Sequence, residues 1–415
     1  MLTNPPRLAR PVPPARPASA ALAAAVLFLG AALPTGAQSP DDDAPIFQAE
    51  DHAFRVVTVV DGLQDPWSVT WLPSGEMLIT ERPGRLRIVR DGVLEPEPVA
   101  GVPEVRYRGQ GGLLDVRLHP DFEANRLVYL SFSKPDDDGS EGTTAVVRGR
   151  LEGDRLEDVE EIFEAEAWSV SGNHFGSRLE FDSDGHLFVT VGDRGASPLE
   201  GSTRSHPAQD LTNHQGTVNR LHDDGRVPAD NPFVGHDEAL PEIWSYGHRN
   251  PQGLAIDAET GDVWVTEHGP QGGDELNLIR PGRNYGWPVI GYGVQYGGPT
   301  IHDAREHPEM EQPLQFWVPS IATSGLLLYT GDRFPAWRGN LFAGGLSGQE
   351  LHRLPIVEGE NGYQVGRMER PPLLPGFARI RDVRQGPDGF IYLALDDRRG
   401  GGTTPVVRLE PVENP

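Results

Sequence analysis

One short unit recurs six times along the chain, and this recurrence limits the folds that the sequence can adopt. Each copy has an apolar strand, a turn rich in Gly, Asp or Pro, and a second strand rich in β-branched or aromatic residues, which predicts a β-hairpin. The copies begin at irregular spacings of roughly 47 to 76 residues. Four clear and two weaker copies start at Trp67, Leu114, Ser177, Gly253, Gly325 and Arg381.

Six hairpins, with further strands between them such as residues 85–91, predict an all-β fold. The expected architecture is a single six-bladed β-propeller of four-stranded antiparallel blades over residues 53–412. Helical periodicity is nearly absent, and 50 glycines and 39 prolines agree with many turns. We expect the apolar segment 54–62 to pair with residues 405–411 and close the ring. Two separate β-domains are the alternative arrangement.

The N-terminal segment has the layout of a secretory signal peptide. Three arginines precede an apolar run over residues 20–33 and small residues follow at 35–37, so we predict a signal peptide over 1–37. The apolar run is shorter than the roughly 20 residues that cross a bilayer as a helix. We therefore expect a periplasmic or secreted protein with a disordered, acidic lead-in over residues 38–52.

Charge and cysteine content restrict the partners of this chain. The formal net charge of −25 argues against nucleic acid and against an anionic membrane surface. The chain contains no cysteine, so it has no disulfide and no attachment point for a covalently bound haem.

The turns before the predicted inner strands supply a ring of polar residues. In a propeller the first strand of each blade lines the central channel, so the residues just before these strands gather at one end of the axis. The arginines, amides and histidine there suit a planar ligand with several negative charges. The alternative is that the arginines pair with Asp or Glu at the seams between blades. The ring comprises Asp65, Trp67, Gln110, Asn173, His174, Arg249, Asn250, Thr323, Ser324, Arg379 and Arg381.

Five blocks of the sequence carry a family resemblance. In order they read "GQGGLLDVRLHPDF", "NHFGSRLEFDSDGHLFVTVGDRG", "GHRNPQGLAID", "TEHGPQGGDELNLIRPGRNYGWP" and "RIRDVRQGPDG". Together they resemble the soluble, pyrroloquinoline quinone (PQQ)-dependent glucose/sorbosone dehydrogenases, also called aldose sugar dehydrogenases. The similarity runs from about residue 63 to residue 397, which is nearly the whole chain after the signal segment.

The resemblance implies roles for residues of the polar ring. His174 matches the general base that takes the proton of the anomeric hydroxyl while hydride passes from the sugar C1 to the quinone. Arg249 and Asn250 match residues that contact the quinone oxygens, and Arg249 would stabilise negative charge on the reduced cofactor. Arginines also suit the PQQ carboxylates, because their donors can bind in pairs. The remaining matches to cofactor contacts are Gln110, Arg379 and Arg381.

Two calcium sites follow from the same resemblance. The main-chain carbonyls of Gly269 and Pro270 match the ligands of a calcium ion that also binds PQQ and would act as a Lewis acid. Glu275 and the main-chain carbonyl of Tyr285 match a second, structural calcium site. A surface carboxylate near a turn is the alternative interpretation of Glu275.

The sequence departs from the family pattern at two positions. Ser347 stands where relatives with known cofactor contacts carry a lysine for a PQQ carboxylate, and serine can donate a hydrogen bond but has no charge. Asn173 replaces an acidic neighbour of the histidine, and an amide cannot raise the basicity of His174 as a carboxylate would. The missing charge at Ser347 predicts weaker PQQ binding than in the tightest binders of the family.

The expected activity is PQQ- and calcium-dependent oxidation of the anomeric carbon of aldose sugars to lactones. Electrons would then pass to a separate quinone, cytochrome or dye. Aromatic residues in the long segment 284–317 suit the C–H face of a sugar or the cofactor ring. Two alternatives stay open: a calcium-dependent lactonase, which would place acidic side chains around the axis, and a secreted propeller that binds a ligand without catalysis.

Overall fold

The computed structural model describes residues 44–359, 362–397 and 402–412. The predicted signal peptide over 1–37 and the first part of the predicted lead-in lie outside these residues. Within the described ranges, no helix is long and apolar enough to cross a membrane. The described residues are nearly all β-structure or loop. Their helical elements are short: α1 (Phe122–Asn125), η1 (Thr203–Ser205), η2 (Pro207–Gln209) and η3 (Pro335–Trp337).

The strands form the six-bladed propeller that the repeats predict, and its first four blades each contain four antiparallel strands. Blade one contains β3 (Pro66–Trp71), β4 (Met77–Glu81), β5 (Arg85–Arg90) and β6 (Val93–Leu94). Blade two contains β7 (Leu113–Leu118), β8 (Leu127–Pro135), β9 (Gly142–Glu152) and β10 (Arg155–Glu164). Blade three contains β11 (Leu179–Phe181), β12 (Leu187–Val191), β13 (Thr217–Leu221) and β14 (Ile243–Tyr246). Blade four contains β15 (Pro251–Ile256), β16 (Val263–Glu267), β17 (Asp274–Ile279) and β18 (Gln315–Trp317).

The last two blades differ from the predicted four strands. Blade five has three strands, and the chain after it forms a separate hairpin, whereas blade six has five strands because the N-terminal strands join it. Blade five contains β19 (Thr323–Leu328), β20 (Leu341–Gly345) and β21 (Glu350–Leu354), and the hairpin contains β22 (Ile356–Gly359) and β23 (Gly362–Val365). Blade six contains, in spatial order, β24 (Arg379–Gln385), β25 (Ile391–Asp396), β26 (Thr403–Val412), β2 (Ala53–Gln64) and β1 (Ile46–Gln48).

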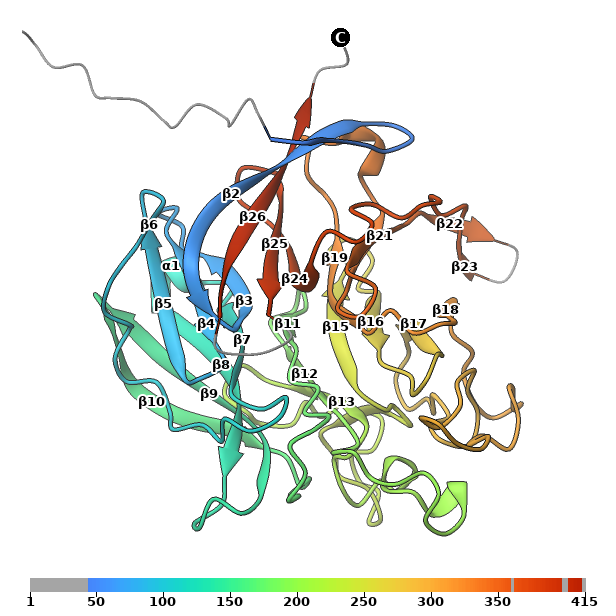
Figure 1. The fold of residues 1–415 in the computed structure, drawn as a ribbon. Helices are drawn as coiled ribbons and strands as arrows, with labels where there is room; N and C mark the ends of the chain where they lie inside the picture. The colour runs from blue at the N-terminus through green and yellow to red at the C-terminus, as the bar shows by residue number, and fades with distance from the viewer. Residues whose placement is uncertain (1–43, 360–361, 398–401, 413–415) are drawn as a thin grey trace, which may run out of the picture. The chain divides into compact units, whose positions relative to one another are not determined.

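The two ends of the described chain close the ring in blade six. Strand β2 pairs with β26 in antiparallel register, with Phe54 opposite Pro411 and Val56 opposite Leu409. Figure 1 shows β2, drawn in blue, beside β26, drawn in red. The predicted pairing of these two segments is confirmed, and it leaves neither strand as an open edge at the join.

The structure differs from the predicted lead-in over residues 38–52. Residues 46–48 form β1, which pairs with β2. The carboxylate of Asp51 accepts a hydrogen bond from Arg353 at 2.8 Å, and Glu50 accepts one from Arg367 at 2.8 Å. Glu50 and Asp51 are thus partners of arginines in another part of the sequence, and the described structure within this segment includes a strand before residue 53.

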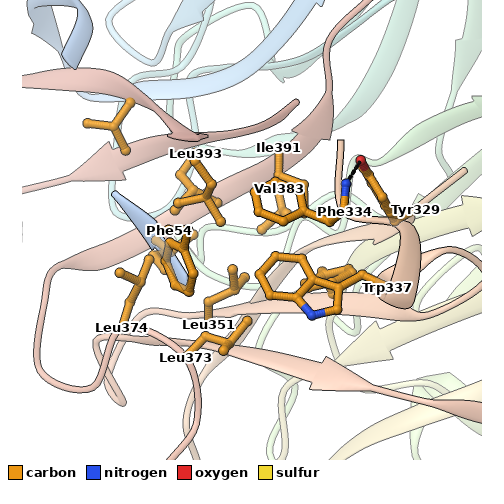
Figure 2. Close-up of a cluster of buried hydrophobic side chains, with 14 of the residues drawn as sticks. Phe54, Tyr329, Phe334, Trp337, Leu351, Leu373, Leu374, Val383, Ile391 and Leu393 are labelled. Carbon is orange, nitrogen blue, oxygen red and sulfur yellow. Dashed lines mark hydrogen bonds between the residues drawn. The ribbon is translucent and has the colours of Figure 1, made fainter. Parts of the chain in front are cut away.

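A cluster of buried apolar side chains anchors the N-terminal strand. The ring of Phe54 lies edge-on to Trp337 at a centroid distance of 5.7 Å, and Phe334 stacks on Trp337 at 4.3 Å. Figure 2 shows these rings together with Leu351 and Leu393 from blades five and six. Burying one such side chain contributes about 1.5–3 kcal/mol to stability. The closure of the ring is therefore stabilised by apolar packing in addition to the hydrogen bonds between β2 and β26.

Buried charged residues link the inner strands across the axis. We call Asp115, Arg178, Asp382 and Arg384 the axial network. Arg178 contacts Asp382 at 2.8 Å, and Arg384 contacts Asp115 at 3.0 Å and Asp382 at 2.8 Å. Each arginine in this network has a carboxylate partner, as buried charges require. The network ties blades two, three and six together and so fixes the turns that precede their inner strands.

Candidate functional site

Turns from three blades meet around His174. The main-chain N–H of His174 donates to the side-chain oxygen of Gln110 at 2.9 Å. The main-chain N–H of Asp193 donates to the carbonyl of Arg249 at 2.8 Å. The side-chain oxygen of Asn250 accepts from the main-chain N–H of Gly176, which follows His174 closely. Residues that precede the inner strands of blades two, three and four therefore share one site.

A buried carboxylate orients the histidine. Nδ1 of His174 lies 2.6 Å from Oδ1 of Asp193, whose residue is only 1% exposed. The same carboxylate accepts hydrogen bonds from the main chain of Gly195 and from the indole of Trp287, each at 2.8 Å. Because an ionised carboxylate can only accept, Nδ1 of His174 carries the proton. Nε2, which has no hydrogen bond to any described residue, is left as the basic nitrogen.

Burial and nearby charge set the protonation of this pair. Burial lowers the pKa of His174 below its ordinary value; Asp193 opposes this shift and the charge of Arg249 adds to it. Burial alone would raise the pKa of Asp193, but His174 and Arg249 outweigh it and hold that pKa below its ordinary value. At neutral pH the site therefore contains a neutral imidazole beside an ionised carboxylate.

The segment "VGDRG" at 191–195 is shaped for this contact. A Cβ atom on Gly192 would lie 2.3 Å from the carbonyl oxygen of His174, so the close approach requires glycine. The buried Arg194 donates to the carbonyl of Asn173, and its guanidinium carbon lies 3.5 Å from the ring centroid of Phe175. One short motif thus supplies the carboxylate and the side chain that holds the turn of the histidine.

The guanidinium of Arg249 has no carboxylate partner among the described residues. Its Nη1 donates to the main-chain carbonyls of His268 at 3.1 Å and Gly269 at 2.8 Å. Its guanidinium carbon lies 5.2 Å from the ring centroid of Trp287. The carboxylate of Glu267 accepts a hydrogen bond from the main-chain N–H of Arg249 at 2.6 Å and does not contact its guanidinium. The side-chain charge is therefore held by dipoles and an aromatic face rather than by a direct ion pair.

Arg379 and Arg381 share a single carboxylate. Arg381 lies 2.8 Å and Arg379 lies 3.5 Å from Oδ2 of Asp396. For these two arginines the alternative of internal pairing is right in part, but two cations face one anion. Arg381 also donates to the side chain of Gln252 at 3.1 Å, and Gln252 donates to the carbonyl of Gly176 at 3.1 Å. This bridge connects blade six to the turn of the histidine.

Two further predicted cofactor contacts lie at the same end of the axis. Ser347 is exposed and donates to the carbonyl of Ser320 at 3.1 Å, and the preceding carbonyl of Leu346 accepts from Arg379 at 3.0 Å. Asn250 is fully buried, and its side-chain Nδ2 has no partner among the described residues. A buried donor without a partner is costly, so an acceptor from a bound ligand would stabilise this site.

The four residues predicted to bind calcium line one hollow, which Arg249 and Trp287 also line. Glu275 in β17 lies directly opposite Glu267 in β16 in the antiparallel ladder. Burial and the charge of Glu267 raise the pKa of Glu275 well above its ordinary value. The described ranges contain no group of three or more Asp, Glu or His side chains that could hold a metal. A calcium ion bound here would therefore need main-chain carbonyls as ligands in addition to any single carboxylate. The four residues are Gly269, Pro270, Glu275 and Tyr285.

The arrangement can be compared with known proteins. A model of the glucose/sorbosone dehydrogenase family matches residues 63–404. The chain belongs to this family. Aldose sugar dehydrogenase YliI of Escherichia coli (strain K12) is 43% identical over 351 residues, which cover 83% of this chain and 91% of the relative. Membership in the glucose/sorbosone dehydrogenase family makes this protein an oxidoreductase.

Solved structures of the family have the same fold. The apo form of the soluble aldose sugar dehydrogenase of Escherichia coli aligns with a TM-score of 0.77 at 39% identity, covering 86% of this chain and 100% of that chain. The PQQ-bound form of an aldose sugar dehydrogenase from Streptomyces coelicolor aligns with a TM-score of 0.66 at 26% identity, covering 90% and 100% of the two chains.

The carboxylates of the site in this dehydrogenase were missed from the sequence. The expectation that Asn173 leaves His174 without an acidic partner is corrected, because Asp193 takes that place. Asp193, Glu267 and Asp396 all lie at or just after the end of the second strand of a blade. In a hairpin this end returns beside the start of the first strand. The pairing of hairpin ends was the signal that could have identified them.

Proposed function

We propose that this protein is a PQQ- and calcium-dependent dehydrogenase that oxidises the anomeric carbon of aldose sugars to a lactone. Two electrons then pass to a separate acceptor, such as a quinone, a cytochrome or a dye. The observation that carries the proposal is the hydrogen-bonded pair of His174 and Asp193 beside Arg249, a cation without a carboxylate partner. The PQQ-bound structure of the Streptomyces relative supports the choice of cofactor.

The donors at this end of the axis fit PQQ, a planar quinone with three carboxylates. Within the described part of the chain, Asn250 offers a buried N–H without a hydrogen-bond partner, and the guanidinium of Arg249 has no carboxylate within ion-pair distance. Arg379 and Arg381 together exceed the charge of Asp396. PQQ supplies the quinone that accepts hydride from the sugar. The residues proposed to hold it are Gln110, Arg249, Asn250, Ser347, Arg379 and Arg381.

The chain's own residues handle the proton and the developing charge. Nε2 of His174 takes the proton of the anomeric hydroxyl, the C1–O bond becomes C=O, and the C1–H bond breaks with its electron pair leaving as hydride. Asp193 accepts the hydrogen bond of Nδ1–H and so stabilises the imidazolium. Arg249 offsets the negative charge that arrives with the hydride. The net products are the lactone, two protons (one from the anomeric hydroxyl and one carried by the hydride) and two electrons for the separate acceptor.

The proposed calcium ligands have suitable chemistry. Carbonyl and carboxylate oxygens are the ligands that calcium prefers. We assign the carbonyls of Gly269 and Pro270 to the ion beside PQQ, and Glu275 with the carbonyl of Tyr285 to the structural ion. Calcium supplies Lewis-acid polarisation of a quinone carbonyl. The carbonyl oxygen of Gly269 accepts a hydrogen bond from Arg249, so the ion would share that oxygen through its second lone pair.

The lactonase alternative is less well supported. A hydrolytic metal needs carboxylates that are free to bind it, and the carboxylates near the histidine are engaged. Asp193 binds His174, Asp396 binds two arginines, and Glu267 accepts from His248 at 2.9 Å.

A periplasmic or secreted location is also part of the proposal, and it depends on the predicted signal peptide over residues 1–37.

Reconstitution tests the proposal directly. Purified apoprotein should gain dye-linked aldose oxidation only when PQQ and calcium are both supplied, and a panel of sugars would define the substrate. His174→Ala should lower kcat/KM about 10²- to 10⁴-fold, because general bases contribute on that order. Turnover by His174→Ala within a few-fold of wild type would refute the assignment of the base. Lactone hydrolysis without PQQ would favour the lactonase instead.

A further inference from the structure

Trp287 contacts both halves of the site. Its indole N–H donates to Oδ2 of Asp193 at 2.8 Å, while Asp193 uses its other oxygen to bind His174 at 2.6 Å. The guanidinium of Arg249 lies 5.2 Å from the centroid of the same indole. Although Trp287 is 94 residues from Asp193 in the sequence, it contacts both the carboxylate that binds the histidine and the arginine.

The main chain on both sides fixes the position of this indole. The main-chain N–H of Trp287 donates to the carbonyl of Gly247 at 2.8 Å. The main-chain carbonyl of Trp287 accepts from the side chain of Gln209 at 2.8 Å. The residue is only 7% exposed. Blade three therefore holds Trp287 in place, and the indole N–H is a fixed donor rather than a group that follows its partner.

The two oxygens of Asp193 are held by different donors. Oδ1 has His174 and the main chain of Gly195. Oδ2 has the indole of Trp287 as its hydrogen-bond donor among the described residues, since Nε2 of His206, at 3.9 Å, is beyond hydrogen-bond distance. A carboxylate with hydrogen bonds to only one oxygen can rotate about its Cβ–Cγ bond. The hydrogen bond from the indole N–H to Oδ2 restricts this rotation.

We propose that Trp287 is a positioning residue that acts through Asp193 and Arg249. Its N–H keeps the carboxylate of Asp193 turned toward His174, and its aromatic face supports the guanidinium of Arg249. Neither contact reaches the reacting atoms of the sugar. The kinetic consequence rests on the proposed dehydrogenase function, whereas the orientation of the histidine by Trp287 and Asp193 does not.

Trp287→Phe separates the two contacts, because it removes the N–H and keeps an aromatic face. We expect kcat to fall about 10- to 100-fold, the range for one hydrogen bond to a charged group, with the KM for the sugar changed less than about threefold. The acid limb of kcat/KM should move to higher pH, because an Asp193 that has lost a donor presents more negative charge to His174. The other charged groups that face the histidine, Arg249 and Arg194, are unchanged.

Trp244→Phe is the matched control. Trp244 also lies beneath an arginine, with Arg220 at 4.8 Å from its ring centroid, and its indole N–H has no partner in the described part of the chain. It belongs to β14 and lies outside the proposed site. We expect this variant to keep kcat and the pH profile within about twofold of wild type.

A second measurement needs neither PQQ nor sugar. In the NMR spectrum of the apoprotein, the indole N–H signal of Trp287 should be missing in Trp287→Phe and should shift in Asp193→Asn. The ring signals of His174 should titrate at higher pH in Trp287→Phe than in wild type. Asp193→Asn preserves size, so it still tests the contact if Trp287→Phe does not fold.

The two measurements can fail separately. Unchanged kcat and unchanged His174 titration in a folded Trp287→Phe would overturn the positioning role, and so would an indole signal that ignores Asp193→Asn. If the apoprotein shows the expected NMR shifts but wild type never oxidises aldoses with PQQ and calcium, the proposed function fails while the contact between Trp287 and Asp193 stands.

Discussion

Arg178 and Arg249 belong to neighbouring turns of the same channel but have opposite surroundings. Arg178 in the axial network contacts Asp382 at 2.8 Å and Asp115 at 3.8 Å. Among the residues that the structure describes, the guanidinium of Arg249 contacts main-chain carbonyls and an indole face. The first arrangement compensates charge within the fold, and the second leaves charge for an incoming anion. We therefore infer that one arginine serves stability and the other serves binding and catalysis.

The largest expected effect is on stability. Arg178→Met should lower the free energy of unfolding by about 3–5 kcal/mol, because it leaves Arg384 as the one cation of the axial network for the two buried carboxylates of Asp115 and Asp382. Urea denaturation of the apoprotein would measure this change. Arg150→Met is the control, since Arg150 is 40% exposed and surface pairs contribute about 0–1 kcal/mol. Equal stability losses in the two variants would contradict the role of the axial network.

Arg249→Met should give the reverse pattern. We expect the free energy of unfolding to change by less than about 1 kcal/mol, because no buried carboxylate loses a direct side-chain partner. PQQ-dependent aldose oxidation should fall about 10²- to 10³-fold, as when a charge-stabilising donor is removed from a transition state. A variant that is unstable but retains its activity would reverse our assignment of the two arginines.

A smaller effect is expected where charge is added at the same end of the axis. Ser347→Lys should lower the dissociation constant of PQQ by about 1.5- to 5-fold, because an exposed lysine gains a modest Coulomb energy beside a carboxylate. A PQQ titration of the apoprotein followed by absorbance would measure it. Ser74→Lys, at an exposed turn of blade one, makes the same charge change away from the site and should have no effect.

The smallest effect is a shift in pH dependence. Because burial lowers the pKa of His174 below 6.5, the neutral base should persist on acidification, and the acid limb of kcat/KM should lie below pH 6.5. Arg249→Met removes a positive charge that contributes to this lowering, so the residual activity should lose its base at a higher pH. A limb above pH 6.5 in wild type would show that the charged form of His174 is favoured instead.

The fold and the composition of the site differ in how far the sequence could predict them. Repeated hairpins predicted the propeller, and the start of each inner strand predicted which polar residues would meet. The partners of those residues were not predicted, since Asp193 lies on the returning arm of the hairpin and not beside His174 in the chain. The pairing of Arg379 with Asp396 follows the same geometry.

Side-chain pairing also limited what the sequence could decide about the arginines. The sequence left open whether they bind a ligand or internal carboxylates, and the answer differs between positions. Arg381 is paired to Asp396, whereas Arg249 is not paired to a described carboxylate. The difference depends on which side chains the strand register brings within about 4 Å, and residue type alone does not contain that information.

The shared sheet of β2 and β26 has a consequence for assembly of the chain. Phe54 can enter its apolar cluster only when β26 provides the adjacent ladder, so β2 must wait until the C-terminal strand has been synthesised. Loss of residues 403–412 would therefore remove the β26 neighbour of β2 and expose a long unpaired edge.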